Sequence, residues 1–447
     1  MKKRTFVKLS AALLSTPLMS PLASFAQDEK LKNWAGNLEY GTNKIDYPKS
    51  VEDIQQIVKK YHKVKVLGTR HCFNRIADSK DNFISLRDMN KMISLDATAR
   101  TVTVEGGMKY GELCPILNDK GFALHNLASL PHISIAGAIT TATHGSGVKN
   151  KNLSSAVAGL EIVNANGEVI TLSKKDEEKF YATVTCLGAL GVITKVTLEI
   201  QPTYMMRQHV YEQLPLQQLK EHFDEIMSAG YSVSLFTDWQ SENINEVWIK
   251  SLVSDASNSK AKTEFFGAKP ATKNVHPIID LSAENCTEQM GVPGAWYERL
   301  PHFKMGFTPS SGKELQAEYF VPHQHAVDAI LAVQRMGKEI SPHLFISEIR
   351  AIDADNLWMS PCYKQPSVAI HFTWKQEWDA VINLLPKIEK ELAPFNAKPH
   401  WGKLFTINAS QFEQLYEKMH DFKNTIAQYD PAGKFRNEFL EKNIYGA

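Results

Sequence analysis

The segment from Leu127 to Gly147 decides the fold, and it reads Leu-Ala-Ser-Leu-Pro-His-Ile-Ser-Ile-Ala-Gly-Ala-Ile-Thr-Thr-Ala-Thr-His-Gly-Ser-Gly. Such small residues let backbone N–H groups approach a ligand closely, and the hydroxyl groups can bond phosphate oxygens. Two other segments share this character: Val66-Leu67-Gly68-Thr69-Arg70-His71-Cys72-Phe73-Asn74 and Leu187-Gly188-Ala189-Leu190-Gly191. One such segment alone indicates an ordinary tight turn, whereas three in one region indicate loops that cradle a phosphate-bearing ligand.

The sequence around these segments predicts a mixed α+β region over residues 30–202. A helix is expected after Ser50, which can cap it together with Asp53, and its apolar face comprises Val51, Ile54, Ile57, Val58 and Tyr61. A second helix carries Leu113, Ile116 and Leu117 and ends at Gly121. Strands are expected at 64–66, 101–104, 160–163, 169–172 and 192–200, and Asn166-Gly167 makes the third and fourth a hairpin. Alternation in the last strand places Val192, Val196, Leu198 and Ile200 on one face.

A domain boundary is expected near Pro202. After it, the mixed pattern of short helices and strands gives way to longer aromatic strands with Pro-rich connections (Pro270 to Pro309). No internal repeat is visible. No G-x-G-x-x-G follows a strand and opens a helix, which argues against a nicotinamide-binding Rossmann unit. No G-x-x-x-x-G-K-[ST] is present either, which excludes a P-loop.

Composition narrows the class of protein. The chain has 447 residues, 43% apolar and 22% charged, so it is globular and long enough for two or three domains. Fifty basic against 49 acidic residues give a net charge of +1, which predicts no nucleic-acid partner. The five cysteines are sparse and lack the close spacing of a zinc site, so we expect neither a disulfide framework nor a metal: Cys72, Cys114, Cys186, Cys286 and Cys362.

The first 26 residues are typical of a secretory signal peptide. Basic residues (Lys2, Lys3, Arg4 and Lys8) precede an apolar stretch from Leu9 to Phe25, and Ser24-Phe25-Ala26 resembles a cleavage site. The order Lys3-Arg4-Thr5-Phe6-Val7-Lys8 also resembles a twin-arginine signal. Cleavage would leave 46 basic and 49 acidic residues, or −3, and no stable membrane span. We expect an exported, periplasmic or extracytoplasmic protein; the alternative is an uncleaved N-terminal anchor.

The three small-residue segments together resemble the FAD-binding domain of the vanillyl-alcohol oxidase superfamily. The chain from about residue 33 to its end is more closely similar to the bacterial alditol oxidases, which act on xylitol and sorbitol. The similar segments are Asn33 to Asn37, Leu127 to His132, Tyr231 to Trp239, Asn285 to Gln289, Leu300 to Phe303, Glu348 to Arg350, His371 to Trp374, Pro399 to Lys403 and Asp430-Pro431.

The resemblance implies an α+β fold with two large parts. Residues 30–202 would form a two-subdomain FAD-binding domain of vanillyl-alcohol oxidase type. Residues 203–398 would form an α+β substrate (cap) domain with a large antiparallel sheet, of the type found in sugar-lactone oxidases. Residues 399–447 would be a C-terminal segment that completes the active site.

The resemblance also implies FAD, attached covalently through His71 to the flavin 8α-methyl carbon. Such a bond needs a neutral, nucleophilic imidazole, which a short Gly-containing turn can present. Arg70 can pair with the pyrophosphate. Residues 115–185 contain no Cys, so a single attachment is expected. His144 is interpreted as a structural contact at the FAD loop rather than a base. The residues implied in FAD binding are Gly68, Thr69, Arg70, His71, Cys72, Ser129, Ser134, Gly137, Thr141, Ala142, Thr143, His144 and Val192.

A group of charged residues marks the substrate side. Glu348 and Arg350 stand two apart in one predicted strand and share a face, as do His371 and Thr373 in another, and Lys403 is expected on one face between Trp401 and Phe405. Charges in an apolar region are costly unless they pair or meet a polar ligand. From the residues alone, a salt-bridge ladder that stabilises a sheet explains them at least as well.

The resemblance instead implies that Ser129, Glu348, Arg350, Thr373 and Lys403 bind a polyol. Catalysis would involve Glu348, Arg350, Lys403 and Ser129, with Arg350 and Lys403 favouring alkoxide character and Glu348 and Lys403 relaying the proton.

The implied reaction is oxidation of a terminal CH₂OH of an alditol to the aldose, with dioxygen reduced to hydrogen peroxide. Ala128, beside Ser129, would leave room for oxygen near the flavin. Two alternatives stay open: an aldonolactone oxidase or dehydrogenase acting on a gulono-, galactono- or arabinono-1,4-lactone, and an exported sugar-binding protein without turnover. No sequence feature selects an oligomeric state.

Overall fold

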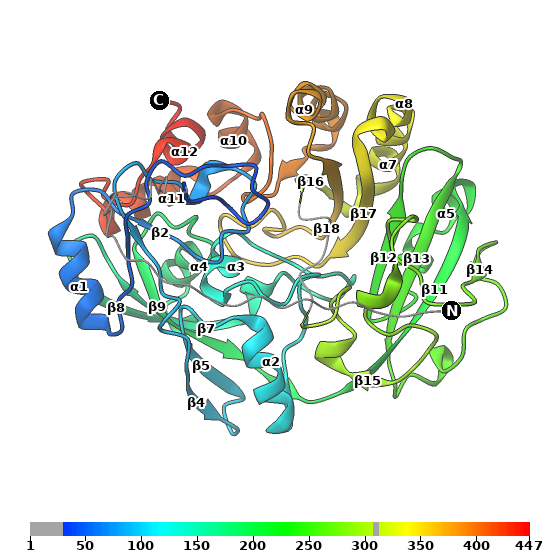
Figure 1. Ribbon diagram of the computed structural model, residues 1–447, viewed down its shortest axis with the longest axis horizontal. Coiled ribbons are helices and arrows are strands. Elements are labelled where there is room, and N and C mark those ends of the chain that lie inside the picture. Colours follow the sequence, from blue (N-terminus) through cyan, green and yellow to red (C-terminus); the bar gives the residue numbers. More distant parts are fainter. Residues whose placement is uncertain (1–29, 307–312) are drawn as a thin grey trace, which may run out of the picture.

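Two β-rich regions divide the chain in the computed structural model, which describes residues 30–306 and 313–447 (Figure 1). The predicted signal peptide at residues 1–26 lies outside these described residues. Within the described ranges, none of the helices combines the length and the apolar character needed to cross a bilayer. The five cysteines are all described, and each is a free thiol.

The N-terminal region contains small sheets that hold the predicted cofactor segments. Within the described residues, a parallel three-stranded sheet has the order β1-β3-β2 and an antiparallel five-stranded sheet the order β4-β5-β9-β7-β8. Their bounds are β1 Ile45–Asp46, β2 Lys65–Val66, β3 Phe83–Ile84, β4 Met92–Asp96, β5 Thr101–Glu105, β7 Val157–Val163, β8 Val169–Ser173 and β9 Val192–Glu199. A short pair joins β6 (Phe122–Ala123) to β10 (Gln201–Pro202). The predicted hairpin is the pair β7–β8.

Within the described residues up to Pro202, the α-helices beside these sheets are α1 Val51–Lys60, α2 Tyr110–Asp119, α3 Ile135–Thr140 and α4 Glu178–Val184. The predicted cap of α1 is confirmed, because Ser50 and Asp53 form a reciprocal capping box. Helix α3 lies inside the segment 127–147, which we expected to be a loop. The short helix is held by Ile135 and Ile139, which are four residues apart and fully buried.

Strand β9 corrects one expected face. Val196 and Leu198 belong to the main core of this region together with Ile193, whereas Val192 packs with Ile54 and Val58 of α1. The register of β9 against β7 shifts between Glu161 and Ile162, where an irregularity breaks the alternation. The extra residue of such a bulge turns the following side chains to the other face, so Val192 does not share the face of Val196.

The expected large antiparallel sheet is confirmed in the second region. Within the described residues it has the order β14-β11-β13-β12-β17-β18-β16-β19, with β15 beside β11. Its strands are β11 Met205–Pro215, β12 Ser232–Thr237, β13 Asn243–Leu252, β14 Lys269–Pro270, β15 Gly294–Ala295, β16 Glu314–Pro322, β17 Leu344–Ile352, β18 Ser367–Lys375 and β19 Lys398–Pro399.

The two faces of this sheet differ in character. One face packs Ile349, Ile370 and Phe372 against covering helices. These are α5 Leu216–Glu221, α6 Phe223–Met227, α7 Ala326–Arg335, α8 Gly337–Ile340 and α9 Trp378–Leu392. On the other face, cross-strand pairing aligns Glu318 of β16 with His371 of β18, and His371 with Glu348 of β17. We call Glu318, His371 and Glu348 the polar row.

The C-terminal helices return to the first region, so the red end of the chain lies beside the blue segments in Figure 1. Helices α10 (Ala409–Leu415), α11 (Met419–Tyr429) and α12 (Glu438–Leu440) contribute Phe412, Phe422 and Leu440 to the core that contains Leu113. Asn437 donates hydrogen bonds to three carbonyl groups near Ile76. The start of α12 is thereby fixed to the N-terminal region.

Candidate active site

A cavity of about 270 Å³ lies where the polar row faces the N-terminal region. All three small-residue segments reach it, through residues that include Gly68, Ser134 and Gly188. Glu318, Glu348, Arg350 and Lys403 line the same cavity. One continuous space therefore joins the predicted cofactor loops to the predicted substrate residues.

His71 lies in the cofactor turn and is held by its neighbours. Its Nδ1 is 2.9 Å from the Thr69 hydroxyl, and its ring stacks on Trp34 with centroids 5.3 Å apart. Arg70, just before it, adopts a left-handed φ of 65°, and its Nη1 donates to the Lys32 carbonyl at 3.0 Å. Burial, with His132 and Arg70 nearby, lowers the pKa of His71 to about 3. The imidazole is therefore neutral at physiological pH.

The residues on this side of the cavity fit FAD. A Cβ added at Gly68 or Gly137 would lie 3.0 or 2.7 Å from the Ser134 hydroxyl, so only glycine leaves the space open. Among the described residues, the Ser134 Oγ and His71 Nε2 atoms are buried without a hydrogen-bond partner. Buried polar groups normally have partners. The Ser134 hydroxyl and the backbone at Gly68 and Gly137 can therefore bind the phosphate-bearing part of a ligand, with the neutral imidazole of His71 lining the same cavity.

Lys403 enters the cavity from a turn, whereas we expected it on one face between Trp401 and Phe405. Its N–H donates to the His400 carbonyl at 3.0 Å, which closes the turn, and Trp401 points away to stack on Phe412. The turn is fixed to the cofactor segment because Asn74 donates to the Trp401 and Lys403 carbonyls at 2.8 and 2.6 Å. The chain reverses here, so alternate residues need not share a face.

Glu318 is the centre of the charged cluster. Its carboxylate accepts hydrogen bonds from Arg350 Nη2 and Lys403 Nζ, each at 2.7 Å, and His144 Nε2 lies 3.2 Å away. Although burial opposes ionisation, Lys403, His144 and Arg350 hold the pKa of Glu318 well below its usual range. The expected partnership of Lys403 with Glu348 is therefore wrong: the lysine pairs with a glutamate two strands away from Glu348.

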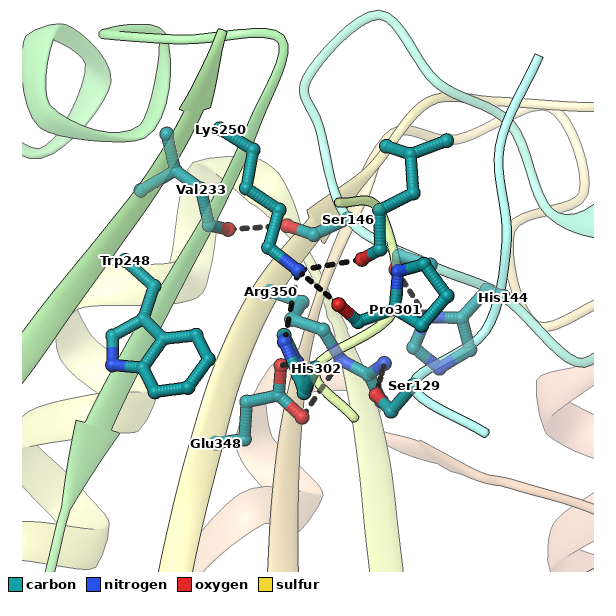
Figure 2. A network of polar contacts seen from close by, with 12 residues as sticks. Ser129, His144, Ser146, Val233, Trp248, Lys250, Pro301, His302, Glu348 and Arg350 are labelled. Atoms are coloured by element: carbon teal, nitrogen blue, oxygen red, sulfur yellow. Dashed lines mark hydrogen bonds and ion pairs between the residues drawn. The ribbon is translucent and has the colours of Figure 1, made fainter. Parts of the chain in front are cut away.

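Glu348 has different partners (Figure 2). His302 Nε2 lies 2.7 Å from its Oε1, and Arg350 Nε lies 3.5 Å from its Oε2. Burial again opposes ionisation, yet Arg350 and His302 hold the pKa of Glu348 well below its usual range. Arg350 also extends Nη1 to within 3.4 Å of the Ser129 hydroxyl. Arg350 thus links both glutamates to Ser129.

The buried histidines of the cavity are neutral. Burial lowers the pKa values of His371 and His400 well below the usual range, and that of His144 also falls. Glu318 and Glu348 then balance Arg350 and Lys403 in charge. These four balanced charges, surrounded by neutral hydrogen-bonding side chains such as His371 and Thr373, suit an uncharged ligand with many hydroxyl groups.

The structure brings most of the predicted site residues to this cavity. Those that line it are Gly68, Thr69, Arg70, His71, Cys72, Ser129, Ser134, Gly137, Thr141, Thr143, His144, Glu348, Arg350, Thr373 and Lys403. Ala142 and Val192 do not line it. Val192 is packed against α1, as the bulge in β9 explains, and Ala142 is buried with a left-handed φ of 56°.

The polar residues of the cavity wall that sequence reasoning missed include Glu318, His302 and His400. A signal for Glu318 exists, because polar Glu314, Gln316 and Glu318 alternate with apolar residues along β16. His302 and His400 lie outside regular strands and have no comparable periodicity.

Two families of known proteins match this chain, one in the N-terminal region and one in the region of the large sheet. Residues 43–173 match the family described as FAD binding domain, and residues 308–443 match the family described as D-arabinono-1,4-lactone oxidase. An alditol oxidase from Streptomyces sp. is 42% identical over 417 residues, which cover 93% of this chain and 99% of that protein. The chain belongs to the alditol oxidase family.

Two more distant relatives of this alditol oxidase family member are a lactone dehydrogenase and a cholesterol oxidase. An L-gulono-1,4-lactone dehydrogenase of Mycobacterium tuberculosis is 25% identical over 92% of this chain and 98% of its own length. A cholesterol oxidase from B. sterolicum shares the fold with a TM-score of 0.75 at 14% identity, covering 96% of this chain and 99% of that chain. The expected α+β fold of vanillyl-alcohol oxidase type is thus confirmed, and FAD is the cofactor.

Proposed function

We propose that this protein oxidises the terminal hydroxyl group of an alditol such as xylitol or sorbitol to the aldose and reduces dioxygen to hydrogen peroxide. The observation that carries the proposal is the charge-balanced cluster of the buried Glu318, Glu348 and Arg350 with the partly buried Lys403, in the cavity that His71 also lines. The 42% identity to an alditol oxidase supports this substrate class over the lactones of the more distant relatives.

The side chains divide the work of binding. Glu348 stays ionised and accepts hydrogen bonds from substrate hydroxyl groups, while Arg350 and Thr373 donate to them. Ser129, within reach of Arg350, meets the hydroxyl group that is to be oxidised. A chain of alternating donors and acceptors is what an open-chain polyol can satisfy along its length.

The bound FAD supplies the two-electron oxidant, and its reoxidation by dioxygen yields hydrogen peroxide. Arg350 and Lys403 favour alkoxide character on the reacting oxygen through their positive charge. His371 is neutral, and its Nε2 is buried in the cavity wall without a partner among the described residues. In the tautomer with the proton on Nδ1, it can accept the hydroxyl proton.

We propose further that His71 holds FAD covalently. The neutral imidazole with an unpartnered Nε2 supports this, because attachment needs a free nitrogen lone pair. If FAD were attached in this way, His71 would give up its ring proton and the 8α-methyl group one hydrogen, with dioxygen as the acceptor of the two electrons.

Acid-precipitated protein is expected to remain yellow, and His71→Ala is expected to release the colour into the supernatant. Absorbance of pellet and supernatant after precipitation measures the partition. His132→Ala is a suitable control, because the ring centroid of His132 lies 5.4 Å from that of His71. This variant is expected to keep its flavin in the pellet. Colour lost from the wild-type pellet would contradict the covalent bond.

Substrate preference is expected to follow the number of hydroxyl groups. Each buried polar group left unpaired costs about 1–3 kcal/mol, or roughly 5- to 150-fold in kcat/KM. Xylitol and sorbitol should therefore be oxidised well above glycerol, and simple alkanols should be nearly inert. Peroxide release and dye reduction are measured across these alcohols and gulono- and galactono-lactone. A lactone preferred over every polyol would favour the alternative activity, and colourless protein without turnover would favour a binding protein.

We also propose that residues 1–26 direct export and are then removed. The basic start, the apolar stretch and the Ser24-Phe25-Ala26 site support this proposal. N-terminal sequencing of protein recovered outside the cytoplasmic membrane should begin at Gln27; a chain that retains Met1 would contradict cleavage.

A further inference from the structure

A buried lysine lies behind the wall that carries Glu348 (Figure 2). Lys250 of β13 is completely buried, and its Nζ donates to the Leu300 carbonyl at 2.6 Å and the Pro301 carbonyl at 3.0 Å. The third contact of the Nζ is His302 Nδ1, at 3.1 Å. An ammonium group has three N–H donors and no acceptor, so these three partners use all of them.

This arrangement fixes the tautomer of His302. Because the ammonium group can only donate, Nδ1 of His302 must accept, and the ring proton of the neutral imidazole must be on Nε2. That Nε2–H points at Glu348 Oε1, 2.7 Å away. In the opposite tautomer, a nitrogen lone pair would face the carboxylate and repel it.

Within the described part of the chain, the hydrogen bond from His302 is the one short side-chain contact of the Glu348 carboxylate. Arg350 is a charged neighbour of Glu348, but its Nη2 is engaged with Glu318 at 2.7 Å, and its Nε is 3.5 Å from Glu348. Removing one partner of a buried carboxylate leaves a group whose desolvation is not compensated. The donor on His302 therefore decides where the Glu348 carboxylate lies.

We propose that Lys250 is a positioning residue of the alditol site: by donating to His302 Nδ1, it sets the tautomer that orients Glu348 toward the substrate hydroxyl groups. The inference rests on the proposed function, in which Glu348 binds the polyol. Lys250 acts through His302 and does not touch the substrate.

The proposal requires a charged Lys250 and a neutral His302, and both charge states are present near pH 6. Burial lowers the pKa of Lys250 to about 7, opposed by Glu348 and Cys286, while Arg350 and Arg299 lower it further. Burial, together with Lys250, lowers the pKa of His302 to about 4, opposed by Glu348. At pH 6, Lys250 of the wild type therefore carries an ammonium group and His302 a neutral imidazole. The kinetics of the wild type and the variants are compared at this pH.

Lys250→Met is expected to raise KM for xylitol about 5- to 150-fold, with a smaller change in kcat, because ordered binding of hydroxyl groups is lost. His302→Asn should behave alike, since its amide is too short to reach Glu348. His302→Gln places an amide N–H near the former Nε2 and should retain a KM close to that of the wild type.

The double variant Lys250→Met/His302→Gln separates positioning from packing. An amide has no tautomer to set, so the glutamine should restore KM toward the wild-type value even without the lysine. Lys398→Met is the matched control: its Nζ contacts the Pro361 carbonyl at 3.4 Å, burial lowers its pKa, and it does not line the cavity. Its KM should not change.

Wild-type KM in flavin-loaded Lys250→Met would overturn the proposal, as would a double variant as impaired as Lys250→Met. Should Lys250→Met fail to fold, ¹⁵N NMR of histidine-labelled wild-type protein decides, with His302→Gln used for assignment. A neutral ring with its proton on Nε2 supports the proposal, and a proton on Nδ1 contradicts it. A wild type inert toward every alditol would instead reject the proposed function, and the NMR measurement would still test the tautomer.

Discussion

Replacing Lys403 with Ala is expected to lower turnover of xylitol by about 10²–10⁴-fold while the fold and the flavin content persist. The substitution removes one of the two cations that favour alkoxide character, and it leaves Glu318 with Arg350 and His144 as partners. Steady-state peroxide formation measures turnover, and the flavin absorbance relative to protein measures loading.

Lys195→Ala serves as the control for Lys403→Ala. Lys195 of β9 forms a partly exposed ion pair with Glu161 of β7 at 2.8 Å, and it does not line the cavity. Its turnover should remain that of the wild type. If folded, flavin-loaded Lys403→Ala turns over xylitol at the wild-type rate, the lysine has no part in the chemistry.

Glu318→Gln is expected to destabilise the protein by about 3–5 kcal/mol, because Arg350 and Lys403 would then be buried without their shared counter-charge. Urea unfolding of flavin-loaded protein measures the loss. Glu339→Gln removes a glutamate that pairs with Lys387 at 2.6 Å on the surface, and it should change stability far less. Equal losses in the two variants would contradict a central role for Glu318.

The difference between the wild type and Glu318→Gln should depend on pH in a defined direction. The pKa of Glu318 is lower in the folded protein than its ordinary value of 4.5. The unfolded chain therefore takes up the proton first on acidification, and the stabilisation is complete above pH 4.5 and declines below it. A difference that grows between pH 4.5 and pH 3 would contradict this linkage.

The cofactor side of the site could be predicted well from the sequence, since it is built from local segments. Gly68 and Gly137 lie close to the Ser134 hydroxyl where a Cβ would not fit, and His71 follows Gly68 within the same turn. The capping of α1 by Ser50 and Asp53 is equally local. Tertiary effects intervene where a bulge moves Val192 and where Ile135 and Ile139 bury a helix inside an expected loop.

The substrate side was harder because its contacts join distant strands. Alternation places Glu348 and Arg350 on one face, but the pairing of Arg350 with Glu318 depends on strand β18 lying between β16 and β17. No local pattern in the sequence gives that order. The salt-bridge ladder considered at first is also partly present, since the same charges pair with each other and line the cavity.

The alignment of the polar row has a consequence for how these enzymes can diversify. An insertion or deletion of a single codon in β16 before Glu318 would exchange the faces of all later side chains in that strand. The carboxylate would then press against the helix-covered face where Tyr319 now packs, and Lys403 and Arg350 would lose their shared partner. Changes of chain length are therefore confined to the connections between strands. New substrate preferences in such a scaffold must arise by exchanging one side chain for another within strands of constant length.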